Sequence, residues 1–239
     1  MESSLPIPEI TIPDRKRHLL RLIIPAFPTF NIYSSFAKRM TALGPLCIGT
    51  MASKLDRWDV EIVDENNYGK RGPLGEDGLP DHDRLQETRP ADVIGFYGGL
   101  TSTAPRLYKL ARHYKGLGAV TLGGGQHFVG ENLREGLENG LDVIVTGEGE
   151  YTIQEFLEAL EDGTSVDTIT GLGLLCDGKV METGNPQPIT DFEALPIPDF
   201  GLLRYARIKW YPVSWARGCG MDCEFCTVKG KMRSCGPER

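Results

Sequence analysis

The chain has 239 residues, of which 40% are hydrophobic and 25% charged, so it can form one large globular domain or two small ones. Its formal charge of −7 argues against a general nucleic-acid binder, and no apolar run approaches the roughly 18 residues of a membrane span. The N-terminus lacks the apolar segment of a secretion signal, so a cytoplasmic protein is expected.

Short apolar runs alternate with helical patterns over the first 165 residues. Strands are predicted at 18–25, 58–65, 91–99, 118–125 and 141–150. Helices are predicted at 46–57, from a cap at Thr103 with Pro105 in its first turn, at 132–139, and after residue 150. Residues 69–80 are rich in Gly and Pro and predict a loop.

Two further segments follow the last predicted helix. Residues 171–183 predict a hairpin that turns at Asp177-Gly178 and either adds to the first domain or braces the next segment. Residues 184–200 contain four prolines and predict an extended linker.

Five strand–helix units with apolar strands predict a five-stranded parallel sheet, doubly wound in a Rossmann- or flavodoxin-like α/β fold. Ligands bind such sheets at the carboxyl ends of the strands. Here those ends are polar or rich in glycine, at 27–29, 64–67, 98–103, 123–127 and 147–150. The glycines either let the backbone approach a large ligand or only make tight turns. No GxGxxG follows the first strand and no GxxxxGK[ST] occurs, which argues against a nucleotide site.

Three of the six cysteines lie close together, in the segment WARGCGMDCEFCTVKGKMR (215–233). Cys219, Cys223 and Cys226 have the spacing C-x3-C-x2-C, and their thiolates could hold three irons of a cubane cluster while the fourth stays open. Residues 201–239 carry 8 basic and 3 acidic side chains, as in a solvated tail or a region that holds anions. The preceding KWYPVSWA (209–216) predicts a strand. The alternative is a structural zinc site with Cys235 as fourth ligand.

The cysteine segment RGCGMDCEFC resembles the cluster motif of radical S-adenosylmethionine (SAM) enzymes. The preceding sheet domain resembles the cobalamin-binding domain of their cobalamin-dependent class B, through GPLCIGTMA (44–52), GGLTSTAPR (98–106), GGGQHF (123–128) and TGEGEYT (146–152). The resemblance divides the chain into a cobalamin-binding domain (1–165), a hairpin and linker (166–205) and the start of a radical SAM barrel (206–239).

The resemblance implies three cofactors. Cys219, Cys223 and Cys226 would ligate a 4Fe-4S cluster, SAM would chelate the open iron, and Phe225 would pack near the adenine. Reductive cleavage of SAM would give a 5′-deoxyadenosyl radical. In most studied members the cobalt carries a methyl group to carbon or phosphorus, and in others the corrinoid serves rearrangement or cyclisation. The implied cobalamin contacts are Gly98, Gly99, Thr101, Ser102, Thr103, Gly123, Gly124, Gly125, His127, Gly147, Glu148 and Gly149. Glu148 and Glu150 precede a helix, where carboxylates are more often N-terminal charges than catalysts, and both are interpreted as contacts on the cobalamin side.

Two departures from the family pattern lead to further expectations. The axial-ligand motif D-x-H-x-x-G is absent, so cobalamin without a histidine ligand from the first loop is expected, with His127 hydrogen-bonding nearby. The chain ends 13 residues after Cys226, whereas a barrel needs about 200 more. The chain alone is therefore expected to be inactive, with an unidentified small-molecule substrate. It would be a shortened gene product, an excised fragment, or one half of a split enzyme whose partner carries the rest of the barrel.

Two alternatives stay open: a corrinoid carrier or sensor whose cysteine loop is unused, and a zinc-containing α/β protein. The remaining candidate side chains have structural interpretations. Cys47 and Cys176 are expected in the core, and His18, His82 and His113 are expected to be structural or solvated. Trp210, Tyr211 and Trp215 could form a stacking platform, but alternation along a barrel strand explains them more simply.

Overall fold

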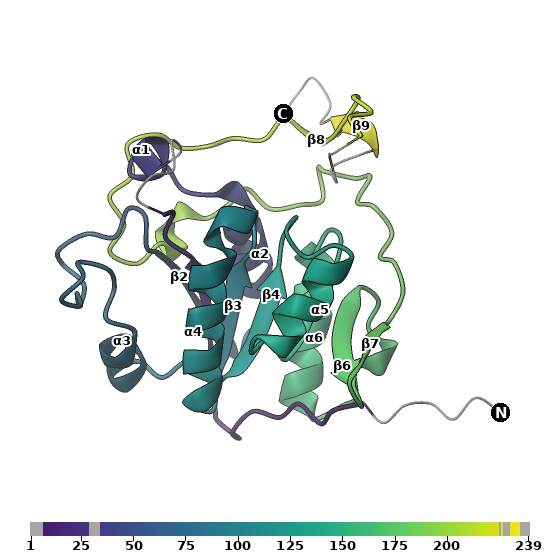
Figure 1. The fold of residues 1–239 in the computed structure, drawn as a ribbon, viewed down its shortest axis with the longest axis horizontal. Coiled ribbons are helices and arrows are strands. Elements are labelled where there is room, and N and C mark those ends of the chain that lie inside the picture. Colours follow the sequence, from purple (N-terminus) through teal and green to yellow (C-terminus); the bar gives the residue numbers. More distant parts are fainter. Residues whose placement is uncertain (1–6, 29–33, 225, 227–229, 235–239) are drawn as a thin grey trace.

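A seven-stranded, mostly parallel sheet covered by helices on both faces forms the body of the computed structural model, which describes residues 7–28, 34–224, 226 and 230–234 (Figure 1). The strand order is β2-β1-β3-β4-β5-β6-β7. The strands are β1 (His18–Ile24), β2 (Trp58–Asp64), β3 (Val93–Tyr97), β4 (Val120–Gly124), β5 (Val143–Val145), β6 (Leu172–Cys176) and β7 (Lys179–Glu182). The first five are parallel, and β6 and β7 are antiparallel to their neighbours.

The five predicted strands are confirmed, but the sheet is wider than predicted. The hairpin at 171–183 forms as β6 and β7, with the expected turn at Asp177 (φ 48°) and Gly178 (φ 73°). It extends the sheet because β6 pairs with β5. β5 is shorter than the predicted 141–150, since the chain leaves the sheet after Val145 and passes through Gly147 at φ 71°.

Helices connect the strands, and the structure corrects one predicted helix range and one predicted helix cap. They are α1 (Ser34–Ala37), α2 (Leu43–Ala52), α3 (His82–Thr88), α4 (Ala104–Gly116), α5 (Glu131–Glu138) and α6 (Glu150–Asp162), with 3₁₀ turns at Thr101–Thr103, Val166–Thr168 and Phe200–Leu202. The helix predicted at 46–57 starts earlier and ends at Ala52. Thr103 stands at the N-cap of α4, but its hydroxyl donates to the Leu100 carbonyl (2.8 Å) instead of capping the helix. No helix in the described ranges is long and apolar enough to cross a membrane.

Two hydrophobic cores lie on opposite faces of the sheet. α2 and α6 pack on one face, against strand residues such as Leu20, Leu22 and Ile62. α4 and α5 pack on the other, against Leu19 and Ile23. Alternate residues of β1 therefore enter different cores, and all seven of its residues are buried. Burial on both faces is typical of parallel sheets and explains the nearly continuous apolar strands.

The linker and the cysteine segment lie against this domain. The Asp199 N–H donates to the Thr50 hydroxyl (2.8 Å), and the Arg204 N–H donates to the Ile62 carbonyl of β2 (2.8 Å). Beyond the linker, β8 (Ala216–Cys219) and β9 (Gly230–Ser234) form a separate antiparallel pair. The strand predicted at 209–216 is wrong over 209–215, a stretch that includes Pro212, which cannot donate to a ladder. The start of a barrel stays a prediction.

Gly125 offers a direct test of how tightly the loop after β4 is packed. Its φ is 117°, and a Cβ there would lie 2.6 Å from the Gly98 carbonyl oxygen. Gly125→Ala should lower the free energy of unfolding by about 2 kcal/mol, measured by urea denaturation. The control is Gly116→Ala, at the end of α4, where a Cβ meets nothing within 4 Å and a gain of about 0.5 kcal/mol is expected. Equal effects of the two substitutions would contradict this packing.

Candidate cofactor site

Ion pairs attach the β8–β9 hairpin to the carboxyl edge of the sheet. Arg217 of β8 donates to Glu148 (Nη1 to Oε1, 3.1 Å) and also pairs with Glu150. Arg233 of β9 donates to both carboxylate oxygens of Glu148 (2.8 and 3.0 Å). Glu148 follows β5 and Glu150 begins α6. The hairpin that carries Cys219 therefore lies beside this edge of the sheet (Figure 1).

The linker completes this contact. The Ile189 N–H donates to Glu148 Oε2 (2.7 Å), and Arg233 donates back to the Ile189 carbonyl. The guanidinium carbons of Arg217 and Arg233 lie 5.4 and 5.7 Å from the Phe192 ring centroid. Burial alone would raise the pKa of Glu148, but hydrogen bonds from Arg233, Ile189 and Arg217 outweigh it and lower the pKa. Glu148, predicted as a cobalamin contact, thus has a carboxylate occupied by the hairpin and the linker.

The three motif cysteines have the chemistry that a cluster requires. Cys219 ends β8, and all three thiols are free and half-buried. The Cys226 N–H donates to the Cys223 carbonyl (3.1 Å), which closes a tight turn. Within the described ranges, no three His, Cys, Asp or Glu side chains are grouped so that they could hold a metal ion. The ligand roles of the three cysteines therefore stay predictions. Phe225 and Cys235 lie outside the described residues.

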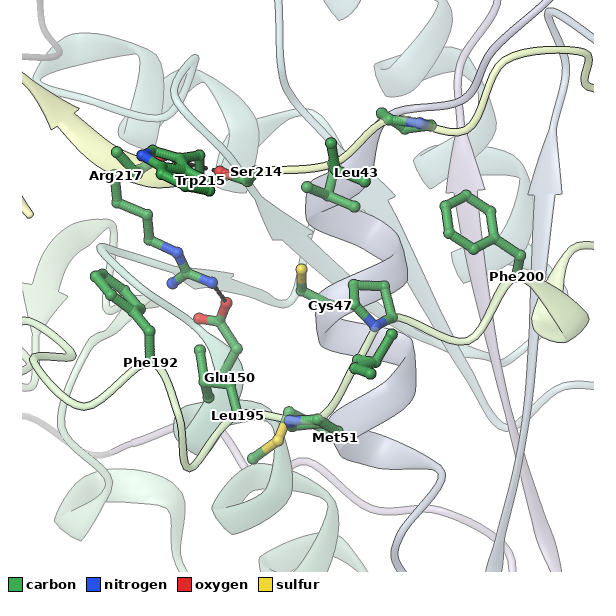
Figure 2. Close-up of a pocket in the computed structure, with 16 residues that line it drawn as sticks. Leu43, Cys47, Met51, Glu150, Phe192, Leu195, Phe200, Ser214, Trp215 and Arg217 are labelled. Atoms are coloured by element: carbon green, nitrogen blue, oxygen red, sulfur yellow. Dashed lines mark hydrogen bonds and ion pairs between the residues drawn. The ribbon is translucent and has the colours of Figure 1, made fainter. Parts of the chain in front are cut away.

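A cavity of about 420 Å³ lies between α2, the linker and the segment that enters β8 (Figure 2). Its walls are mainly apolar, and Arg217 and Glu150 form a charged pair there. Cys47, predicted as a core residue, is half-buried in this wall, one helical turn from Met51. Burial raises the pKa of the Cys47 thiol. Cys176 is buried in β6 as predicted.

Three aromatic residues expected to alternate along a barrel strand lie in irregular chain instead. The Trp210 ring lies 6.4 Å from that of Phe36, and Tyr211 meets Phe200 edge-on at 4.9 Å. Trp215 lines the cavity and is 64% exposed. The predicted alternation along a strand is therefore wrong, because β8 begins only at Ala216 and the three aromatic residues precede it.

Internal packing accounts for several of the glycines predicted to line the cobalamin site. A Cβ on Gly98 would lie 2.6 Å from the Phe128 ring, and one on Gly123 would lie 2.5 Å from Leu141. Added Cβ atoms at Gly99 and Gly149 would likewise meet Tyr97 and Val145. In contrast, a Cβ on Gly124 would meet no atom closer than 3.9 Å. The exposed members of the predicted set are Thr101, Ser102, Gly125 and Gly147, whereas Thr103 is buried.

His127 is buried and uses both ring nitrogens. Nε2 lies 2.9 Å from the Tyr108 hydroxyl, and Nδ1 lies 3.3 Å from the Thr101 hydroxyl. Burial lowers the pKa of His127. Both contacts are to protein hydroxyls, and the predicted hydrogen-bonding role of His127 near a corrinoid stays a prediction.

The remaining histidines are structural, as predicted. His18 is buried against the Trp58 ring with Asp92 at 3.6 Å, and His113 pairs with Asp83 at 3.1 Å. His82 is buried on α3, where Nδ1 lies 2.8 Å from the Tyr114 hydroxyl and Nε2 lies 3.0 Å from Glu65.

Two buried carboxylates organise the carboxyl end of β2. Glu65 accepts hydrogen bonds from Arg106 (2.5 Å at the shortest), His82 and the Ala26 N–H (2.8 Å). Burial alone would raise the pKa of Glu65, but the bonds from His82 and Arg106 outweigh it and lower the pKa to about 2. Asp64 shows the opposite balance, because burial raises its pKa to about 6 against hydrogen bonds from Thr41 and two asparagines.

The sequence indicated only part of this cluster. Asp64 and Glu65 belong to the predicted polar strand end at 64–67. The partners of Glu65, His82 and Arg106, are 17 and 41 residues away from it along the chain. The short helix α3 that carries His82 has no periodic signal. Glu65 follows the edge strand β2 and is bonded to Ala26 after β1 and to Arg106 of α4, after β3. The cluster is therefore next to the position between β1 and β3 where the chain changes the side on which it adds strands, and doubly wound sheets bind ligands at that position.

The geometry defines the chain as a doubly wound α/β domain with a cysteine hairpin fastened to its carboxyl edge. The structure resembles that of OxsB, a cobalamin-dependent SAM radical enzyme, with a TM-score of 0.65 and 18% identity, and the match covers 92% of this chain and 30% of OxsB. It also resembles that of TsrM of Kitasatospora setae, a radical SAM methyltransferase, with a TM-score of 0.55 and 17% identity, and the match covers 76% of this chain and 32% of TsrM.

Curated relatives match this chain over part of its sequence and over less than half of their own length. An uncharacterized methyltransferase of Pyrococcus horikoshii is 28% identical over 196 residues, covering 77% of this chain and 40% of the relative. The anaerobic magnesium-protoporphyrin IX monomethyl ester cyclase of Rubrivivax gelatinosus is 29% identical over 173 residues, covering 64% and 29%. No protein-family model matches the chain. The chain thus spans well under half of these relatives, and the resemblance to cobalamin-dependent radical SAM enzymes is confirmed at the level of the fold.

Glu65 should make folding stability depend on pH. Its pKa falls from an ordinary 4.5 to about 2 on folding, which is worth about 3 kcal/mol of stability above pH 4.5 and is lost as the pH falls toward 2. Glu65→Gln should therefore lower the free energy of unfolding at pH 7 by about 3 kcal/mol, as measured by urea denaturation. The gap to the wild type should close below pH 4.5.

The matched control is Glu87→Gln, which removes an exposed carboxylate paired with Arg84 and should change stability by less than about 0.5 kcal/mol. A gap for Glu65→Gln that stays constant from pH 7 to pH 3 would contradict the predicted linkage.

Proposed function

We propose that this chain is the corrinoid- and cluster-binding portion of a cobalamin-dependent radical SAM enzyme with methyltransferase-like chemistry. One observation carries the proposal: a loop with three free thiols is fastened by Arg217 and Arg233 to the carboxyl edge of a doubly wound sheet. Among the similar structures, OxsB binds cobalamin and SAM, and TsrM binds cobalamin and a [4Fe-4S] cluster.

The corrinoid would lie at the carboxyl edge of the sheet. Among the predicted contacts, Thr101, Ser102, Gly124, Gly125 and Gly147 would face it, because these residues are exposed or leave open space above the strand ends. Gly98, Gly99, Thr103, Gly123, His127 and Gly149 would support the loops from behind, whereas Glu148 holds the β8–β9 hairpin and the linker. No histidine from the loop after β1 would help to hold the corrinoid, as the sequence predicts.

Cys219, Cys223 and Cys226 would hold a 4Fe-4S cluster as thiolates, with SAM on the open iron and Phe225 near its adenine. Together the cluster and the corrinoid would supply an electron for SAM cleavage and a methyl group for transfer. Methyl transfer is favoured as the reaction by the name of the Pyrococcus relative, and the Rubrivivax cyclase marks the alternative of ring formation. The division of the chain at 165 and 205 belongs to this proposal, and the inactivity of the chain alone stays a prediction.

The test is the metal and corrinoid content of the chain after anaerobic reconstitution with iron, sulfide and hydroxocobalamin. We expect about one cobalt and about four irons per chain, with the spectra of both cofactors. A variant with Cys219, Cys223 and Cys226 all changed to Ala should keep cobalt and lose iron. Cys47→Ala should keep both, because Cys47 lies on α2 and outside the motif.

Two other outcomes would replace the proposal. Cobalt without iron in the wild type would indicate a corrinoid carrier or sensor with an unused cysteine loop. Stoichiometric zinc that is unaffected by iron and sulfide, with no cobalt, would establish a zinc-containing α/β protein instead.

A further inference from the structure

The contact between the β8–β9 hairpin and the carboxyl edge of the sheet is made by several charged side chains. Two acidic side chains from the β5–α6 turn, Glu148 and Glu150, meet two arginines from the two strands of the hairpin, Arg217 and Arg233. We call these four residues the clamp. The side chains are 6–25% exposed, so the pairs are only partly screened by water. Ion pairs at this depth fix geometry more firmly than exposed pairs do.

Glu148 is the hub of the clamp. Its Oε1 accepts from Arg217 and Arg233, and its Oε2 accepts from Arg233 and the Ile189 N–H. One carboxylate thereby joins both hairpin strands and the linker. Because Arg217 is paired across the hairpin with Arg233, two like charges stand together and need this shared anion between them.

The clamp lies close to the cysteine loop in sequence. Arg217 precedes Cys219 by two residues on β8, and Arg233 lies on the strand that returns from the loop. Phe192 of the linker stacks against both guanidinium groups and limits their movement. Both ends of the loop are therefore held at the same place on the sheet domain.

We propose that Glu148, Glu150, Arg217 and Arg233 are positioning residues, which set the place of the cysteine loop over the carboxyl edge of the sheet before any cofactor binds. The catalytic relevance of that placement rests on the proposed function, but the clamp itself is a property of the chain without cofactors. The proposal gives Glu148 and Glu150 a role that is separate from cluster ligation by the cysteines and from cofactor contact by the glycine-rich loops.

The test is hydrogen–deuterium exchange of the full chain without cofactors, followed by mass spectrometry. In Arg217→Gln and in Glu148→Gln, amides of 216–219 and 230–234 should exchange about tenfold faster, while those of β1 and β3 keep wild-type protection. Arg217→Lys, which keeps the charge but loses the two-pronged geometry, should give an intermediate rate. Arg84→Gln, which breaks an exposed pair on α3, should leave the hairpin unchanged.

A second measurement keeps the test decisive if one variant is unstable. Arg233→Gln combined with Glu148→Gln should speed hairpin exchange by less than the product of the two single effects, because both substitutions disrupt the Arg233–Glu148 pair. Wild-type exchange of the hairpin in Arg217→Gln, Arg233→Gln and Glu148→Gln would overturn the clamp, as would faster exchange spread equally over β1 and β3. Failure of the proposed function would instead show as absent cobalt and iron in the wild type, with these exchange rates unaffected.

Discussion

Burial of the parallel sheet on both faces is the constraint on which the rest of this structure depends. Every residue of β1 is buried, and the neighbouring strands are nearly as enclosed. One buried ion pair, Arg21 with Glu61, lies in the middle of β1 and β2 and is also bonded to α3. The polar groups available to a ligand lie instead at the strand ends. Because β1 to β5 run in one direction, those ends share one edge. The acidic groups after β2 and β5 and the cysteine hairpin all lie at this edge.

Carboxylates at a partly desolvated edge need partners, and the chain satisfies this need in two ways. Glu65 takes its partners, Arg106 and His82, from the sheet domain itself, so its charge is compensated whatever the hairpin does. Glu148 and Glu150 take theirs largely from the hairpin. An ion left without its partner at this depth is costly, whereas the formed pair gains only modestly over water. The β8–β9 hairpin is therefore held at the β5–α6 turn mainly because its release would leave Glu148 and Glu150 partly buried without their arginine partners.

Periodicity and turn chemistry in the sequence were sufficient to predict the strands, most helices and the Asp177-Gly178 hairpin, because each of these depends on neighbouring residues. The same reasoning could not place β6 beside β5, since register between distant segments leaves no local pattern. It missed α3, whose seven residues are too few for a periodic signal. It also predicted a strand at 209–215, where an apolar and aromatic composition outweighed the single Pro212. At the site, the cysteines were visible as a motif, whereas the arginine partners of Glu148 were not.

The glycine-rich strand ends have a physical role that differs from the one their composition suggests. Gly98, Gly123 and Gly125 give up side chains so that Phe128 and the neighbouring backbone can pack closely. Close packing leaves these loops few alternative conformations, and a loop that is already ordered pays little further entropy when it binds a ligand. The exposed backbone and hydroxyls at Thr101 and Ser102 are thus presented from a rigid base. A broad, flat ligand would gain most from such a surface, since its contacts are spread over several loops that need no rearrangement.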